Sequence, residues 1–189
     1  DVDRRALEAV RVIGAKPIEV SVPDFPYSML YQLVLAEAAA AFAPLTSSNR
    51  DDELRRQDDM AWPNSIRRAH LFPAVEMVQL ERMRCQVMVA FDGLFSTVDA
   101  IIGPSLAANI ISATNASGHP CLALKAGFLD RPTRTMTNEP LDPKCPLHRV
   151  PCTVSLWADH FREDLLVTLG RAIEQVRRNT RRSRPCTPK

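Results

Sequence analysis

Residues 109–128 (N-I-I-S-A-T-N-A-S-G-H-P-C-L-A-L-K-A-G-F) place the strongest constraint on how this 189-residue chain can fold. They join a polar, Gly- and Pro-containing turn at 115–120 to an apolar run at 121–128 that is typical of a buried strand. Just upstream, V-D-A-I-I-G at 98–103 has the composition of a second buried strand. Two buried strands separated by a polar turn predict a sheet whose connecting segments can line a ligand site.

Hydrophobic periodicity predicts the remaining elements. Apolar residues at three- and four-residue spacing predict helices at 3–14, 27–42, 72–95 and 161–178. Alternation or a short apolar run predicts further strands at 16–22 and 152–157. Residues 44–64 are expected to form a loop with one short helix near 51–59, and residues 129–150 a proline-rich loop. This pattern predicts an α/β fold with a mixed sheet flanked by helices.

The composition, 46% hydrophobic and 24% charged, is ordinary for a folded soluble protein, and the net charge of +2 indicates no strongly charged partner. Charge is uneven, because residues 177–189 carry six Lys or Arg and no acid, which leaves 18 basic against 22 acidic residues elsewhere. We interpret 177–189 as a frayed, disordered basic tail and 1–176 as a single partial domain. Binding of nucleic acid by the tail is the less favoured interpretation, so nucleic acid is not an expected partner.

Five scattered cysteines without a C-x-x-C pair indicate reduced thiols in a cytoplasmic protein, with Cys121 and Cys152 as small core residues. No apolar run reaches about 18 residues, so no membrane span is expected. The four histidines are far apart in sequence and form no H-x-x-x-H or H-E-x-x-H pair, and there is no phosphate- or dinucleotide-binding loop. Neither a metal nor a cofactor is therefore expected.

No local motif forms a convincing catalytic set. Asp92 and Asp99 could be paired carboxylates, or a helix cap and a strand-end charge. Ser117 and His119 are neighbours in a turn, without the G-x-S-x-G elbow that activates a serine. The turn at 112–119 is the best local candidate for the wall of a binding site, although Asn115 could equally cap the turn.

Five segments, in the same order, resemble the C-terminal part of amidase signature enzymes. They are the helix and G-A-K-P-I-E-V run followed by V-P-D-F-P, the segment W-P-N-S-I-R-R-A-H-L-F-P-A-V-E-M-V-Q-L-E-R-M-R, the segment F-D-x-L-F-x-x-V-D-A-I-I-G-P-S, the segment N-A-S-G-H-P-C-L-A-L-K-A-G-F, and T-V-S-L-W before F-R-E-D-L-L. The resemblance implies an α/β fold that is the C-terminal part of the amidase signature fold.

Amidase signature enzymes hydrolyse amide carbon–nitrogen bonds, or transfer ammonia from them, with two serines and a lysine in a Gly/Ser-rich segment. The 189 residues contain no such segment, so the resemblance assigns no catalytic residue here and implies that this chain alone is inactive. It implies a small-molecule amide as substrate of the intact enzyme, a missing N-terminal half as partner, and a homodimer as a further arrangement to consider.

The resemblance also implies three substrate-binding residues, Asn109, Thr114 and Asn115. Asn109 stands where the tRNA-dependent amidotransferases carry an Asp that holds the amino group of glutamine, which argues against glutamine as the substrate. In this interpretation the chain completes the sheet and supplies a wall of the substrate pocket. The alternative is a stand-alone, non-catalytic binding or scaffold domain of the same architecture.

Overall fold

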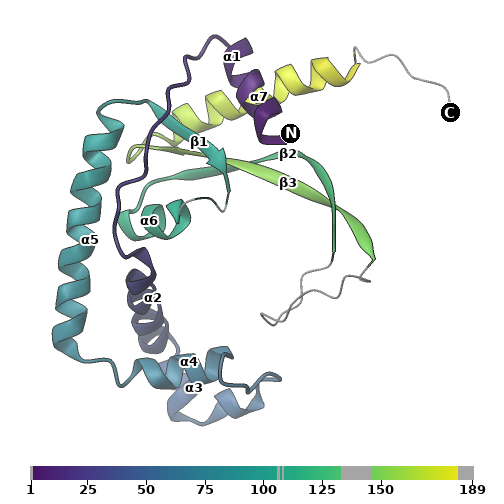
Figure 1. Cartoon of the computed structure of the whole chain (residues 1–189). Helices are drawn as coiled ribbons and strands as arrows, with labels where there is room; N and C mark the ends of the chain where they lie inside the picture. Colours follow the sequence, from purple (N-terminus) through teal and green to yellow (C-terminus); the bar gives the residue numbers. More distant parts are fainter. Residues whose placement is uncertain (1, 106, 108, 133–145, 183–189) are drawn as a thin grey trace. The chain divides into compact units, whose positions relative to one another are not determined.

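The computed structural model of the chain describes residues 2–105, 107, 109–132 and 146–182 (Figure 1). The described residues group into two compact units. The sheet unit comprises the residues up to Ser21, the segment from Phe95 to 107, and the described residues from Gly118 onward. The helical unit comprises Val22–Leu94 and Asn109–Ser117.

The sheet unit contains three strands: β1 (Ala100–Pro104), β2 (Cys121–Pro132) and β3 (Leu147–Ala158). Their order is β1-β3-β2, and β3 pairs antiparallel with both neighbours. β1 and β2 therefore run in the same direction, as expected for strands joined through a helix, but β3 lies between them. The expected α/β class with helices flanking a sheet is confirmed. The expected sheet was mixed, whereas the strand pairings among the described residues are all antiparallel.

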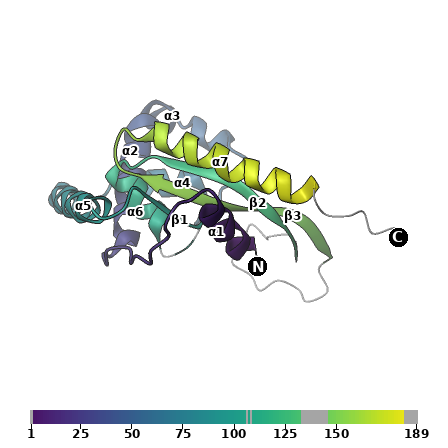
Figure 2. The ribbon, with the colours of Figure 1, turned by 90° about the horizontal axis from the view of Figure 1, so that it is seen from above.

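Helices α1 (Val2–Val12) and α7 (Glu163–Arg182) pack against this sheet and against each other. Figure 2 shows α7 running alongside β2. Alternate β3 residues Val154, Leu156 and Ala158 join Leu166 and Ile173 of α7 in one apolar core. Each large aliphatic side chain buried there contributes roughly 1.5–3 kcal/mol. This core sets the positions of the strand ends.

Two sequence expectations around this sheet are wrong. Residues 16–22 form no strand, and Ile18 is exposed, because Pro17 and Pro23 interrupt the backbone donors that a strand needs. Residues 129–150 were expected to form a loop, yet β2 continues to Pro132 and β3 begins at Leu147, where the two strands pair residue for residue. Residues 133–145 lie outside the described residues.

The helical unit contains α2 (Tyr27–Ala41), α3 (Ala43–Ser47), the 3-10 helix η1 (Arg50–Glu53), α4 (Trp62–Ala69), most of α5 (Ala74–Phe95), and α6 (Ile110–Ser117). α2 packs against α3, α4 and α6. The long helices α2 and α5 confirm the sequence prediction. Between them, the expected loop contains α3, η1 and the first part of α4 in place of one helix near 51–59.

Residues 112–119 do not form the expected turn, because most of them belong to α6. The Ser117 hydroxyl donates to the Ala113 carbonyl at 2.9 Å, which makes a polar residue compatible with a helix. The turn itself is limited to residues 118–120, with Gly118 at a φ of 83° after the helix end. Polar composition alone therefore suggested a longer turn than the backbone forms.

The cysteine prediction is partly correct. Cys85, Cys121 and Cys152 are free thiols; Cys152 packs against the core, but Cys121 is exposed and is not a core residue. Cys145 and Cys186 lie outside the described residues. Among the helices of the described chain, none combines the length and the apolar character needed to cross a membrane.

Candidate functional site

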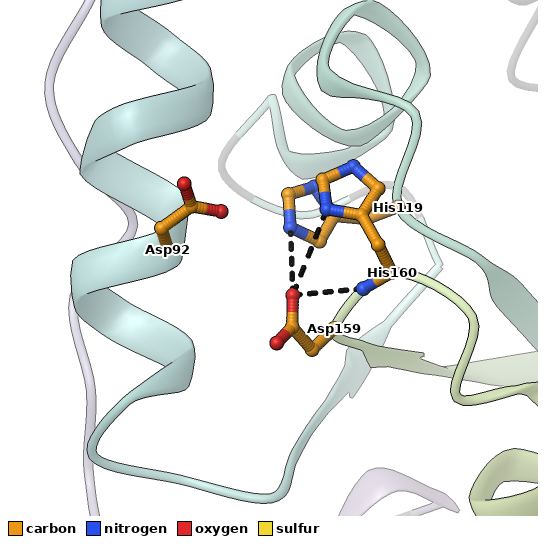
Figure 3. Close-up of side chains that lie close together, drawn as sticks. All are labelled: Asp92, His119, Asp159 and His160. Carbon is orange, nitrogen blue, oxygen red and sulfur yellow. Dashed lines mark hydrogen bonds and ion pairs between the residues drawn. The ribbon is translucent and has the colours of Figure 1, made fainter.

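Two histidines and an aspartate meet at one edge of the sheet unit. β3 ends at Ala158, which pairs with Ala100 at the start of β1, and Trp157 pairs with Cys121 at the start of β2. His119 precedes β2 by two residues, and Asp159 and His160 directly follow β3. Strand pairing therefore brings the three side chains together (Figure 3). We call them the His–Asp–His cluster.

The Asp159 carboxylate is the centre of this cluster. Its Oδ1 lies 3.8 Å from Nε2 of His119 and 3.6 Å from Nδ1 of His160, and it accepts the backbone N–H of His160 at 2.8 Å. The two imidazole rings lie 4.0 Å apart between centroids, at 36°. Figure 3 also labels Asp92, which belongs to α5 in the helical unit and is not counted in the cluster.

Burial differs sharply within the cluster. The His119 side chain is fully buried and its ring stacks on Phe95 at 4.9 Å, whereas Asp159 is 52% exposed and His160 27% exposed. The Ala158 N–H donates to the Pro120 carbonyl, which ties the segment carrying His119 to the end of β3. The cluster thus combines one rigid imidazole with a carboxylate that solvent can reach.

Sequence reasoning missed this cluster. The four histidines are far apart in the sequence, and no short spacing links them into a metal-binding motif. His119 and His160 are neighbours only because β2 and β3 are paired with Cys121 opposite Trp157. No local motif could have revealed them, although a correct strand register would have done so.

Three hydroxyl side chains form a second polar group in the sheet unit. Ser155 donates to Ser105 at 2.8 Å, and the Ser105 and Thr153 hydroxyl oxygens are also 2.8 Å apart. Thr153, Ser155 and Trp157 alternate along β3 and face away from the apolar core. Trp157 is 1% exposed, and no described residue accepts its indole N–H. The hydroxyls satisfy one another, so this group is a polar contact network of the sheet.

The three residues expected to bind substrate all lie in the helical unit. Asn109 is exposed and precedes α6 with a φ of 58°, and Asn115 is exposed on α6. Thr114 is buried, and its hydroxyl donates to the Ile110 carbonyl at 2.8 Å. The Thr114 hydroxyl proton is therefore used within the helix, while the two asparagine side chains face solvent.

Comparison with known proteins identifies the fold. No protein-family model matches the chain, and no curated protein matches it significantly in sequence. Solved structures that are similar to it include three enzymes. A bacterial aryl acylamidase of the amidase signature family covers 93% of this chain with a TM-score of 0.66 and 15% identity.

The other two structures are also amidase signature enzymes. A 6-aminohexanoate cyclic dimer hydrolase covers 93% of the chain with a TM-score of 0.62 and 14% identity. An allophanate hydrolase variant from Kluyveromyces lactis covers 91% with a TM-score of 0.61 and 18% identity. The chain spans only 39%, 40% and 28% of these three proteins, respectively. The chain therefore has the fold of a part of the amidase signature enzymes.

Proposed function

We propose that this chain is part of an amidase signature hydrolase that cleaves amide carbon–nitrogen bonds. The observation that carries the proposal is the agreement over 93% of the chain with an aryl acylamidase, at a TM-score of 0.66. The other two similar structures are also hydrolases. Because the chain spans 39% of the acylamidase, its contribution would be a part of the fold and one wall of the substrate pocket.

The chemistry of α6 supports the pocket-wall role. An asparagine side chain offers both an amide donor and a carbonyl acceptor, so it can pair with either half of an amide substrate. Asn109 and Asn115 present such groups to solvent at the start and along the length of α6. Thr114 would act indirectly, through the packing of α6, since it is buried and its hydroxyl donates to the Ile110 carbonyl.

The nucleophile and the oxyanion donors would come from a part of the enzyme outside this 189-residue chain. A single oxyanion donor is worth roughly 3 kcal/mol of transition-state stabilisation, and the nucleophile contributes more. We therefore expect no amide hydrolysis by the 189-residue chain alone. Residues 1–176 would belong to one catalytic domain with the missing part as its partner.

The test compares the protein isolated from its natural source with the purified 189-residue chain. The intact protein is expected to have a mass well above 21.1 kDa and to release arylamine from simple anilides, while the chain alone releases none. In the intact protein, Asn115→Ala should lower kcat/KM roughly tenfold by removing one substrate hydrogen bond. The matched control is Gln175→Ala, which removes another exposed amide side chain but lies on α7, outside the candidate wall at 112–119.

Two results would contradict the proposal. The first is a natural protein of about 21.1 kDa without amidase activity, which would favour a stand-alone binding or scaffold domain. The second is amide turnover by the purified 189-residue chain that survives removal of contaminants, which would show that the nucleophile lies within it.

A further inference from the structure

The His–Asp–His cluster has the donor set of a transition-metal site. Two imidazole nitrogens and a carboxylate oxygen are ligands that zinc and related divalent ions use in proteins. The three candidate ligand atoms, one each from His119, Asp159 and His160, all lie within 4.8 Å of one another. We propose that these residues bind one divalent transition-metal ion, with Zn²⁺ the best match to the donors. This proposal is independent of amide hydrolysis.

The distances from the Asp159 carboxylate oxygen to the two histidine nitrogens are close to those between ligand atoms that share one zinc ion. Zinc binds nitrogen and oxygen at about 2.0–2.2 Å, so neighbouring ligand atoms of a tetrahedral site lie about 3.3–3.6 Å apart. The Asp159 Oδ1 atom is 3.8 Å from His119 Nε2 and 3.6 Å from His160 Nδ1. Small rotations of the partly exposed Asp159 and His160 side chains would close this difference, while His119 stays in place.

The electrostatics of the cluster also favour a cation. Two imidazoles at a centroid distance of 4.0 Å would repel each other if both were protonated, because the two positive charges would be close. A metal ion binds both rings in their neutral form and places its own positive charge beside the Asp159 carboxylate. The single carboxylate offsets half the charge of a divalent ion.

The surroundings hold the ligands from the protein side and leave access from solvent. Phe95 stacks on the buried His119 ring, and the Ala158–Pro120 backbone hydrogen bond holds the two ligand-bearing segments together. The backbone N–H of His160 donates to Asp159 Oδ1, which orients the carboxylate. Asp159 is 52% exposed, so an ion can enter on that side. Three protein ligands leave a coordination position for water.

The first experiment is equilibrium dialysis of the 189-residue chain against Zn²⁺ alone, with protein-bound zinc measured by elemental analysis. One zinc per chain is expected. Asp159→Asn and His160→Gln should each weaken binding at least about tenfold, since loss of even an outer-shell partner of a metal site costs 10–100-fold. Both side chains are partly exposed, so circular dichroism should confirm that the variants remain folded.

Matched controls lie at the far end of the same sheet. Asp130→Asn and His148→Gln change the same residue types at exposed positions of β2 and β3, away from the cluster, and should leave zinc affinity unchanged. Co²⁺ provides a second probe, because a His and Asp site gives tetrahedral ligand-field bands without the near-ultraviolet thiolate band that cysteine ligands produce.

The outcomes are decisive in either direction. Stoichiometric zinc, weakened by both cluster variants and by neither control, supports the site. Absence of zinc binding overturns it, as does binding that both cluster variants leave unchanged. A thiolate band in the Co²⁺ spectrum would assign the ion to cysteines and also overturn the proposal. Each readout measures metal, so its failure is separate from any failure of the amidase proposal.

Discussion

The guanidinium of Arg177 donates a hydrogen bond to the backbone carbonyl of Ala126, at the point where β2 bulges away from β3. A second donor of the same group binds the carbonyl of Lys125. The pairing register shifts between Lys125 and Gly127, and such a bulge leaves backbone groups without ladder partners. Arg177 supplies those partners from α7, so this residue belongs to the packed part of the sheet unit.

Replacing Arg177 by Met should lower the free energy of unfolding by about 1–3 kcal/mol, because the bulge carbonyls lose charged donors. The control is Arg178→Met, the next residue along α7, which is exposed and pairs with Glu174 at 3.5 Å. That surface pair is worth at most about 1 kcal/mol. Urea unfolding of both variants checks the prediction, and equal losses would contradict the role assigned to Arg177.

Two helical glycines should respond differently to alanine. Gly93 on α5 has open space at its Cβ position, so Gly93→Ala should stabilise the protein by up to about 1 kcal/mol through helix propensity. A Cβ on Gly170 of α7 would lie 2.6 Å from a terminal methyl of Leu122. Gly170→Ala should not stabilise the protein in this way, because the partly buried Leu122 side chain must move to make room for the added methyl group. Thermal unfolding that shows equal gains would refute close packing of α7 on β2.

Asp51 is a buried carboxylate in the helical unit that depends on Arg67. The Arg67 Nη2 atom lies 2.6 Å from Asp51 Oδ2 and 2.6 Å from Asp52 Oδ1, and Asp51 is 3% exposed. Arg67→Gln would leave the Asp51 charge without this partner. The free energy of unfolding should fall by more than about 1 kcal/mol. The fall should stay below the roughly 3–5 kcal/mol that breaking a fully buried ion pair costs, since Arg67 is partly exposed.

The control for Arg67 is Asp52→Asn, which removes the exposed partner of the same guanidinium and should cost at most about 1 kcal/mol. Chemical denaturation of the two variants gives the comparison. If Asp52→Asn lowers the free energy of unfolding as much as Arg67→Gln does, the stabilising effect of Arg67 does not come from its pairing with the buried Asp51.

Alkaline pH should weaken the helical unit through Tyr27. Burial, with a smaller contribution from the charge of Asp24, raises the pKa of the Tyr27 hydroxyl above its usual 10.0. The folded protein therefore holds this proton more tightly than the unfolded chain. The resulting stability is fully present below pH 10.0 and is lost as the pH rises through the folded-state pKa. The hydroxyl also donates to the Pro23 carbonyl.

Tyr27→Phe should flatten the fall of stability above pH 10.0 and cost about 1 kcal/mol at neutral pH through the lost hydrogen bond. The chain has two tyrosines, so a Tyr31→Phe variant leaves Tyr27 alone to report its ionisation by ultraviolet absorbance. A midpoint at or below pH 10.0 in that variant would disprove the burial effect.

The basic segment 177–189 shows where sequence reasoning stops. Its composition predicts a tail, whereas α7 continues to Arg182 and Arg177 binds the β2 bulge. Residues 183–189 lie outside the described residues. A run of basic residues has the same composition whether it is solvated or is one end of an amphipathic helix, so only its packing distinguishes the two.

The sequence by itself determined part of the local structure. Periodic apolar residues predicted α2, α5 and α7, and apolar runs predicted β1 and the start of β2, because these patterns reflect which face of an element is buried. The order of short motifs was also enough to indicate the amidase signature fold. These features depend on residues that are near one another in the chain.

Only the tertiary structure decided which strands pair and which side chains meet. β3 lies between β1 and β2, and this non-local pairing places His119 beside Asp159 and His160. Likewise, α6 forms where composition suggested a turn, because it packs against α2, while the Thr114 and Ser117 hydroxyls bond to carbonyls one helical turn earlier. Pairing and register depend on the burial of a shared core, which no single segment of sequence encodes.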